Sequence, residues 1–183
     1  MAFKNKVIAN PKTGQTIKFL QTAKETGGRL LEMETTFRAY SREPMAHYHP
    51  KQEEFFTIIS GELRVRIHGD LKTYVEGDQF HVPRNTVHAM WNASGAAAIV
   101  NWKVTPALNT ESFFETTIGL ASEGKTDEKG MPNILQVALI ANKYDNIFRL
   151  SRPPYFLQKI IFSILVPVAY VAGYRSAYDK YLN

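Results

Sequence analysis

PMAHYHPKQEE, residues 44–54, is the stretch from which the fold and the function of this chain are best approached. Side chains two positions apart on a β-strand point to the same face, so His47 and His49 can reach one ion together. Tyr48 then points to the opposite face. The spacing predicts a strand that presents two imidazoles to a common centre.

A carboxylate and a third imidazole follow the histidine pair. Pro50 supplies no ladder donor, so the chain turns there, and a β-branched and aromatic strand begins at Glu54. The turn resets the alternation, which lets the Glu54 carboxylate rejoin the imidazoles. About thirty residues later, PRNTVH at residues 83–88 ends in His88. Three neutral imidazoles and one carboxylate predict a site for one divalent transition metal ion, Zn, Fe, Ni, Mn or Cu.

These residues carry a family resemblance. Residues 45–61 fit the pattern His-x-His-x4-Glu-x6-Gly, the first motif of the cupins. Residues 77–92 fit the second motif, Gly-x5-Pro-x-Gly-x2-His-x3-Asn. The matching positions are His47, His49, Glu54, Gly61, Gly77, Pro83, His88 and Asn92. The resemblance is to the small single-domain cupins and covers about a quarter of the chain.

One motif position departs from the pattern, and one has two candidate residues. Asn85 stands where the second motif has its middle glycine, and Asn is the non-glycine residue best able to adopt a positive φ. We therefore expect the turn to form. Glu53 competes with Glu54 for the carboxylate role, but the spacing to Gly61 favours Glu54.

The resemblance implies an antiparallel jelly-roll barrel and a metal held by His47, His49, Glu54 and His88. In this family such sites support dioxygenases, isomerases, epimerases and decarboxylases. A metal-dependent enzyme acting on a small organic molecule inside the barrel is therefore one hypothesis, with Glu54 as a candidate base. The other is a non-catalytic module that holds a metal or small ligand and uses its tail as an interaction element.

Other residues have plainer interpretations. A lone strand histidine is more often a surface or core residue than a ligand, and we interpret His68 and His81 in that way, although His81 could line the cavity. Four large side chains near the motifs are candidates for the cavity wall or for plain core: Phe56, Met90, Trp91 and Trp102.

Composition limits the other function classes. The 183 residues contain no cysteine, which excludes disulfides and thiolate ligands and is compatible with a cytoplasmic location. The net charge is +5, but the lysines and arginines are scattered, so we expect no nucleic-acid partner. The first residues lack the long apolar run of an export signal.

The order of patterns along the chain predicts a mainly β protein with a helical extension. Short alternating runs separated by Gly, Pro and Asn continue to about residue 107, which favours an antiparallel sandwich or barrel over residues 1–107. In the strand at residues 29–37, Leu31, Met33 and Thr35 share one face. Residues 108–183 then show helical periodicity, which predicts an extension that packs on the barrel or on a dimer mate.

Three helices are expected in this extension. The first follows a cap at Asn109 or Thr110, and the second follows Pro132. In the first helix, the spacing predicts one apolar stripe of Phe113, Phe114, Thr117 and Leu120. The third begins near Pro153 and bends at Pro167.

Residues 160–173 are apolar almost all round. A membrane span needs about 20 apolar residues, and this run is shorter. We expect packing within the chain or in a homodimer rather than contact with a membrane, with a membrane-surface role as the alternative.

Overall fold

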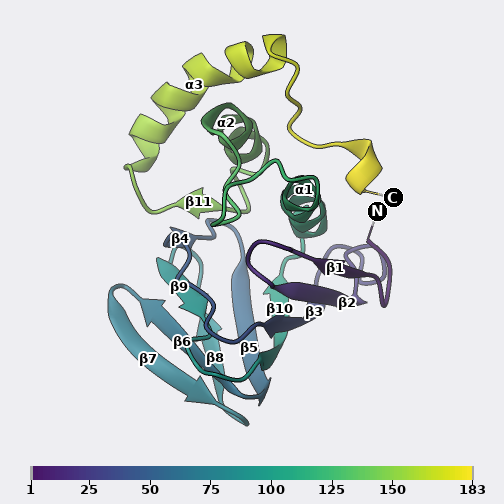
Figure 1. The fold of residues 1–183 in the computed structure, drawn as a ribbon, viewed down its shortest axis with the longest axis vertical. Coiled ribbons are helices and arrows are strands. Elements are labelled where there is room, and N and C mark those ends of the chain that lie inside the picture. The colour runs from purple at the N-terminus through teal and green to yellow at the C-terminus, as the bar shows by residue number, and fades with distance from the viewer. Residues whose placement is uncertain (1, 183) are drawn as a thin grey trace.

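The structure is a computed structural model that describes residues 2–182. Two antiparallel sheets lie face to face (Figure 1). The first contains, in spatial order, β1 (Val7–Ala9), β2 (Thr16–Gln21), β3 (Leu31–Phe37), β10 (Ala98–Thr105), β5 (Glu53–Ser60) and β8 (Gln79–Val82). The second contains β11 (Arg149–Leu150), β4 (His47–Tyr48), β9 (His88–Trp91), β6 (Glu62–Ile67) and β7 (Asp70–Val75). The predicted mainly β, antiparallel jelly-roll architecture with C-terminal helices is confirmed.

Alternation along the strands builds the core between the sheets. Along β3, Leu31, Met33 and Thr35 are buried while the residues between them are half-exposed, as the pattern predicts. The side chains of β10 alternate in the same way from Ala98 to Val104. Burial of these faces against each other stabilises the fold at roughly 25 cal/mol per Å² of apolar surface.

The Asn85 turn forms as predicted. Its φ is 60°, in the left-handed region that its side chain tolerates. The backbone N–H of Asn85 donates to the carbonyl of His49 at 2.9 Å, which ties the second motif to the first. Asn92, fully buried, donates its amide to the carbonyls of Phe37 and Ala96 and so has a structural role.

Three α-helices follow the strands: α1 (Thr110–Ser122), α2 (Ile134–Lys143) and α3 (Tyr155–Val171), with a short 3-10 helix at Asp179–Tyr181. Figure 1 shows α2 between α3 and the end of the second sheet, with α3 outermost. Asn133 caps α2 by accepting the N–H of Gln136. Asn109 occupies the cap position of α1 without a side-chain hydrogen bond.

The buried side of α1 differs from the predicted stripe. Phe113, Phe114 and Thr117 are only half-buried, whereas Glu115 and Thr116 are buried. The reason is that α1 packs against β1 on one side and the C-terminal 3-10 helix on another, so its buried surface is broader than one stripe.

The Glu115 side chain accounts for one of these polar positions. Its carboxylate pairs with Lys6 Nζ at 2.7 Å, which satisfies a buried charge that periodicity alone would place outside.

A two-residue strand that the sequence did not predict joins the extension to the second sheet. In β11, Arg149 pairs with Tyr48 and Leu150 with His47. The N–H of Ser151 extends the pairing to the carbonyl of Ala46 at 3.0 Å. We call residues 144–151, from the end of α2 through β11, the strap. The strap brings the helical extension against the strand that carries His47.

Within residues 2–182, no helix is long and apolar enough to cross a membrane. α3 has 17 residues, which at 1.5 Å per residue is about 25 Å, and Pro167 lies inside it. This length is less than the roughly 30 Å of hydrocarbon that a span must cross.

Gly61 offers a test of the packing between the sheets. It has a φ of +78°, and a Cβ there would lie 2.6 Å from the carbonyl oxygen of Ala97. Gly77 has a similar φ of +88° with nothing within 4 Å of a Cβ. We expect Gly61→Ala to lower the free energy of unfolding by about 1–3 kcal/mol more than Gly77→Ala, because only the first adds a clash. Urea unfolding measures both, and equal losses would show that the contact is unimportant.

Candidate metal centre

The structure brings the three motif histidines together at one end of the sheets. His47 lies on β4 directly opposite His88 on β9, and His49 follows two residues after His47. One ligand nitrogen from each ring lies within 4.8 Å of the other two. Ligands about 2.1 Å from one ion lie about 3–4 Å apart, so three nitrogens this close could reach one ion with small side-chain movements.

Glu54, rather than Glu53, is the carboxylate at this centre. Glu54 is 1% exposed, and its Oε2 lies 3.1 Å from His88 Nε2 and 3.3 Å from His49 Nε2. Glu53 points the other way, to the surface, where it contacts His81 and Arg84. The alternation of β5 explains the difference, because neighbouring residues on a strand face opposite sides.

Each imidazole is oriented by a backbone carbonyl at its Nδ1. The distances are 3.2 Å from His47 to Met45 O, 2.6 Å from His49 to Ile147 O, and 2.9 Å from His88 to Thr86 O. A carbonyl only accepts, so each Nδ1 carries the proton and each neutral ring keeps its lone pair on Nε2. Histidines that bind metals are usually fixed in this way.

Trp102 orients the carboxylate. Its indole Nε1–H donates to Glu54 Oε1 at 3.1 Å, which leaves Oε2 directed at the histidines. We interpreted Trp102 as wall or core, and its polar role was missed. The alternation of its strand predicts that Trp102 points inward. The contact with Glu54 also depends on the strand register, which pairs Trp102 with Phe56, two residues after Glu54.

The electrostatics of the cluster suit a cation. Burial would raise the pKa of Glu54, but His49 and His88 beside it hold that pKa well below its usual range, so the carboxylate is ionised at neutral pH. Burial, with the neighbouring imidazoles, lowers the pKa of His47 well below its ordinary value. Burial disfavours charge on His49 as well, yet the Glu54 carboxylate raises the pKa of His49.

Three buried atoms at this centre have no hydrogen-bond partner among the described residues: His49 Nε2, His88 Nε2 and Glu54 Oε2. They approach one another within 3.3 Å without hydrogen-bond geometry. Unsatisfied buried polar atoms are costly and rare. Lone pairs that converge without bonding to one another fit a shared cation, so the residues present suit a divalent metal ion with nitrogen and oxygen ligands.

The strap covers this centre. Ile147 supplies the carbonyl that orients His49, and the Phe148 ring stacks on His47 at 4.7 Å between centroids. Phe148 also packs on Phe113 of α1 at 5.3 Å. Tyr144, 1% exposed, anchors the other end of the strap through its hydroxyl contact with Ser112 at 2.7 Å. The extension therefore lies over the end of the sheets that holds the ligands.

The two remaining histidines lie away from the centre. His68 is exposed in a turn with a φ of 50°. His81 stacks on Phe55 at 4.4 Å on the outer side of β8, with its side chain 41% exposed, so it does not line the cavity. The surface interpretation of both residues is confirmed.

The candidate wall residues divide between core and cavity. Phe56 is core, stacked on Phe80 at 4.6 Å. Trp91 faces away from the histidines and lies against the Arg66 guanidinium, 5.6 Å from its ring centroid. Met90, two residues after His88 on β9, shares the face of that ligand and also lines a cavity.

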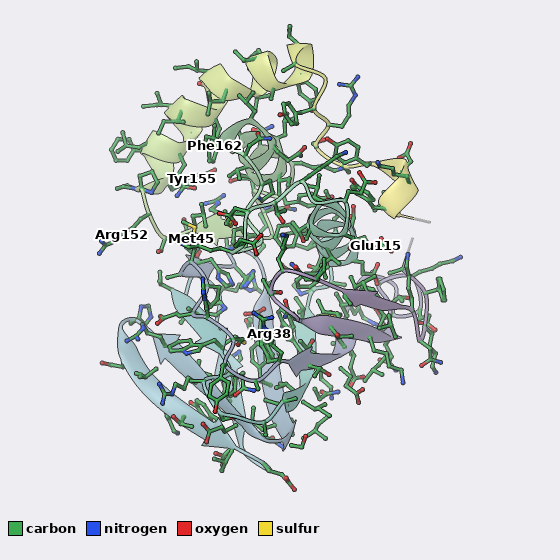
Figure 2. All side chains as sticks on the ribbon, viewed as in Figure 1. Arg38, Met45, Glu115, Arg152, Tyr155 and Phe162 are labelled. Carbon is green, nitrogen blue, oxygen red and sulfur yellow. The ribbon has the colours of Figure 1, made fainter. Side chains whose placement is uncertain are left out.

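That cavity has a volume of about 1040 Å³ and lies beside the centre. Met45 and Met90 line it, and each is two residues from a ligand, Met45 before His47 and Met90 after His88. The cavity therefore begins one row of side chains from the ligand pair. Loops at 11–15, 38–45 and 127–131 form its remaining walls. In Figure 2, Arg38 and Met45 mark this side of the molecule.

The charges around the cavity do not balance locally. Its cations are Lys12, Arg38, Arg42 and Lys129, and its acids are Glu43, Asp127 and Glu128. Glu43 binds Arg66 outside the cavity, Glu128 binds Lys12, and Asp127 accepts backbone N–H groups and interacts electrostatically with Lys129. Within residues 2–182, Arg38, Arg42 and Lys129 lie in no ion pair. The cavity thus carries unmatched positive charge.

Comparison with known proteins bears on the fold. The family model described as the cupin domain matches residues 35–103. No curated protein matches the sequence. A predicted oxalate decarboxylase from Thermotoga maritima has a similar structure, with a TM-score of 0.50 and 15% identity, over 58% of this chain and 99% of that one.

Two further solved structures are similar in part. An RmlC-like cupin from Shewanella frigidimarina has a TM-score of 0.49 and 20% identity, over 61% of this chain and 94% of that one. A sugar phosphate isomerase from a cupin superfamily, from Silicibacter pomeroyi, has a TM-score of 0.45 and 21% identity, over 52% and 62% of the two chains.

The family match spans both motifs, from β3 to β10, and includes all four residues of the candidate centre. The two-sheet architecture agrees with it. Residues 35–103 therefore match the cupin domain family, and a helical extension follows them.

Proposed function

We propose that this cupin holds one divalent transition metal ion and is a metal-dependent enzyme that acts on a small anionic molecule. The observation that carries the proposal is the convergence of the free Nε2 atoms of His49 and His88 and the free Oε2 of Glu54, all buried and without a hydrogen-bond partner among the described residues. His47 completes the ligand set. We infer dioxygenase- or isomerase-like chemistry, which such a centre can support, and a cytoplasmic location.

The protein ligands define what the ion can do. Three imidazoles and one carboxylate leave one or two positions of a five- or six-coordinate ion free to polarise a substrate oxygen. Trp102 holds Glu54 in its ligand orientation. The low pKa of Glu54 makes it a weak proton acceptor, so a role as base requires that the carboxylate move away from His49 and His88.

The cavity supports an anionic substrate. Arg38 and Arg42 lie along it in no ion pair among residues 2–182, and Met45 and Met90 separate it from the ligands. Arginine binds carboxylate and phosphate groups with paired donors. A small carboxylate or phosphate ester could rest on these cations and direct an oxygen towards the centre past the two flexible methionines.

Phe148 of the strap covers the metal centre on the side of the helical extension. Stacked on His47 and on Phe113, it excludes water from the strap side of the centre. A dry site strengthens the electrostatic interactions inside it. In this proposal substrate enters from the cavity, and the strap stays in place.

The first prediction concerns metal content. We expect the protein to bind about one transition metal ion per chain, and His47→Ala or His88→Ala to lose most of it. His68→Ala and His81→Ala serve as controls because both residues lie at the surface, and they should keep the metal. Elemental analysis of native and reconstituted protein measures this. Metal-free protein in both preparations would exclude the metal site.

The second prediction isolates the residue that positions the carboxylate. Trp102→Phe removes the N–H that holds Glu54 but keeps an aromatic ring in the core. We expect metal affinity to fall by about 10- to 100-fold while the four ligands remain. Trp91→Phe is the matched control, because Trp91 faces away from the centre. Competition with a chelating dye measures both affinities, and equal affinities would show that the indole contact has no role.

The third prediction tests the anionic substrate. We expect metal-loaded protein to bind oxalate or glucose 6-phosphate, and Arg38→Gln or Arg42→Gln to weaken binding by about 10-fold or more with metal content unchanged. Arg64→Gln, on the exposed side of β6, is the control. Calorimetry measures affinity, and electron paramagnetic resonance of the Mn- or Cu-loaded protein reports whether the anion reaches the ion. An ion with no exchangeable position would defeat the enzyme proposal and favour a non-catalytic binding module.

A further inference from the structure

The outer face of α3 is apolar, which is the reverse of an ordinary surface helix. We define this face by seven residues at spacings of three and four: Phe156, Leu157, Ile160, Ile161, Ile164, Val168 and Val171. Their exposed fractions run from 38% at Leu157 to 92% at Val171. Ser163, at the edge of this face, donates its hydroxyl to the carbonyl of Ile160.

The inner side of α3 already has its partner. Gln158 and Ala169 are its buried residues, and the helix packs along α2. Figure 2 shows Tyr155 and Phe162 on this inner side, and both line a small crevice against α2 and the strap. The orientation of the helix is therefore fixed by its own contacts, and within residues 2–182 nothing covers the outer face. Contiguous apolar surface of this kind marks an interaction site.

The charges beside this face have one sign. Between Asp145 and Asp179 the sequence has no acidic residue, whereas it has four basic ones. Arg149 is paired with Asp145. The other three are Arg152 before the helix, Lys159 beside the crevice on its inner side and Arg175 after it. They are exposed and lie in no ion pair between described residues. An apolar face framed by unmatched cations complements an anionic bilayer surface.

A second copy of the chain complements this face less well. A two-fold contact would place the same surface on both sides, so Arg152 and Arg175 of each copy would lie at the edges of one interface. No acid from residues 146–178 is available to neutralise them. Like charges brought together in this way oppose association.

We propose that the outer face of α3 is a membrane-surface docking site that lies flat in the headgroup region of an anionic bilayer. Its apolar residues enter the boundary of the acyl chains, and its flanking cations contact lipid phosphates. The 17-residue length and Pro167 keep the helix in the plane of the surface rather than across it. The proposal is independent of the metal centre.

The experiment is flotation of the full-length protein with vesicles. We expect binding to vesicles of phosphatidylcholine with phosphatidylglycerol, and much weaker binding to phosphatidylcholine alone. Ile160→Glu with Ile164→Glu should abolish binding, because both residues are on the outer face. Leu71→Glu with Val75→Glu is the matched control, since these are exposed apolar residues of β7. Metal content and circular dichroism confirm that the variants fold.

A second variant set keeps the test decisive if the Glu pair misfolds. Arg152→Gln, Lys159→Gln and Arg175→Gln together should lower partitioning into anionic vesicles by about 100-fold, since each surface cation contributes about fivefold. They should leave binding to neutral vesicles unchanged. Absence of binding to either vesicle type would overturn the proposal. Light scattering could instead show a homodimer that Ile160→Glu with Ile164→Glu converts to a monomer. That result would also overturn the proposal, because the face would then be a dimer interface.

Discussion

A buried carboxylate between two imidazoles is the constraint on which the site depends. Glu54 is ionised, and one of its oxygens is satisfied by Trp102 while the other faces His49 and His88. An uncompensated charge in a protein interior is strongly destabilising. The buried carboxylate therefore needs positive charge beside it. A divalent ion would supply that charge more fully than a shared proton.

The helical extension is part of this site rather than a separate appendage. The strap gives the Ile147 carbonyl to His49 and the Phe148 ring to His47, and β11 adds a strand beside β4. The packing of Tyr144 against α1 thus holds an orienting group for a ligand. Loss of the extension would expose the ligands and remove the Ile147 carbonyl that keeps the proton of His49 on Nδ1. β1 to β10 precede residue 108 and the helices follow it, but β11 of the later part adds to the second sheet, so the centre draws on both parts.

The sequence was sufficient to predict which side chains converge where local strand geometry determines the direction in which they point. The two-residue spacing of His47 and His49 sets their common face, and the spacing to Gly61 favours Glu54 over Glu53, in agreement with the contacts of both residues. A backbone carbonyl such as that of Ile147 has no sequence signal, because every residue carries one. The two-residue β11 is too short to show a period. In α3, residues apolar on all sides cannot indicate which side is buried, and only contacts with α2 decide it.

The strap also links the site to the outer face of α3. Gln158, buried in the first turn of α3, donates to the carbonyls of Leu150 and Pro153 at 2.8 and 2.6 Å. Leu150 in turn pairs with His47. The same short segment therefore sets the direction of α3 and completes the cover of the centre. Because α3 is apolar on all sides, the bonds that fix its inner side also decide which of its apolar residues are left exposed.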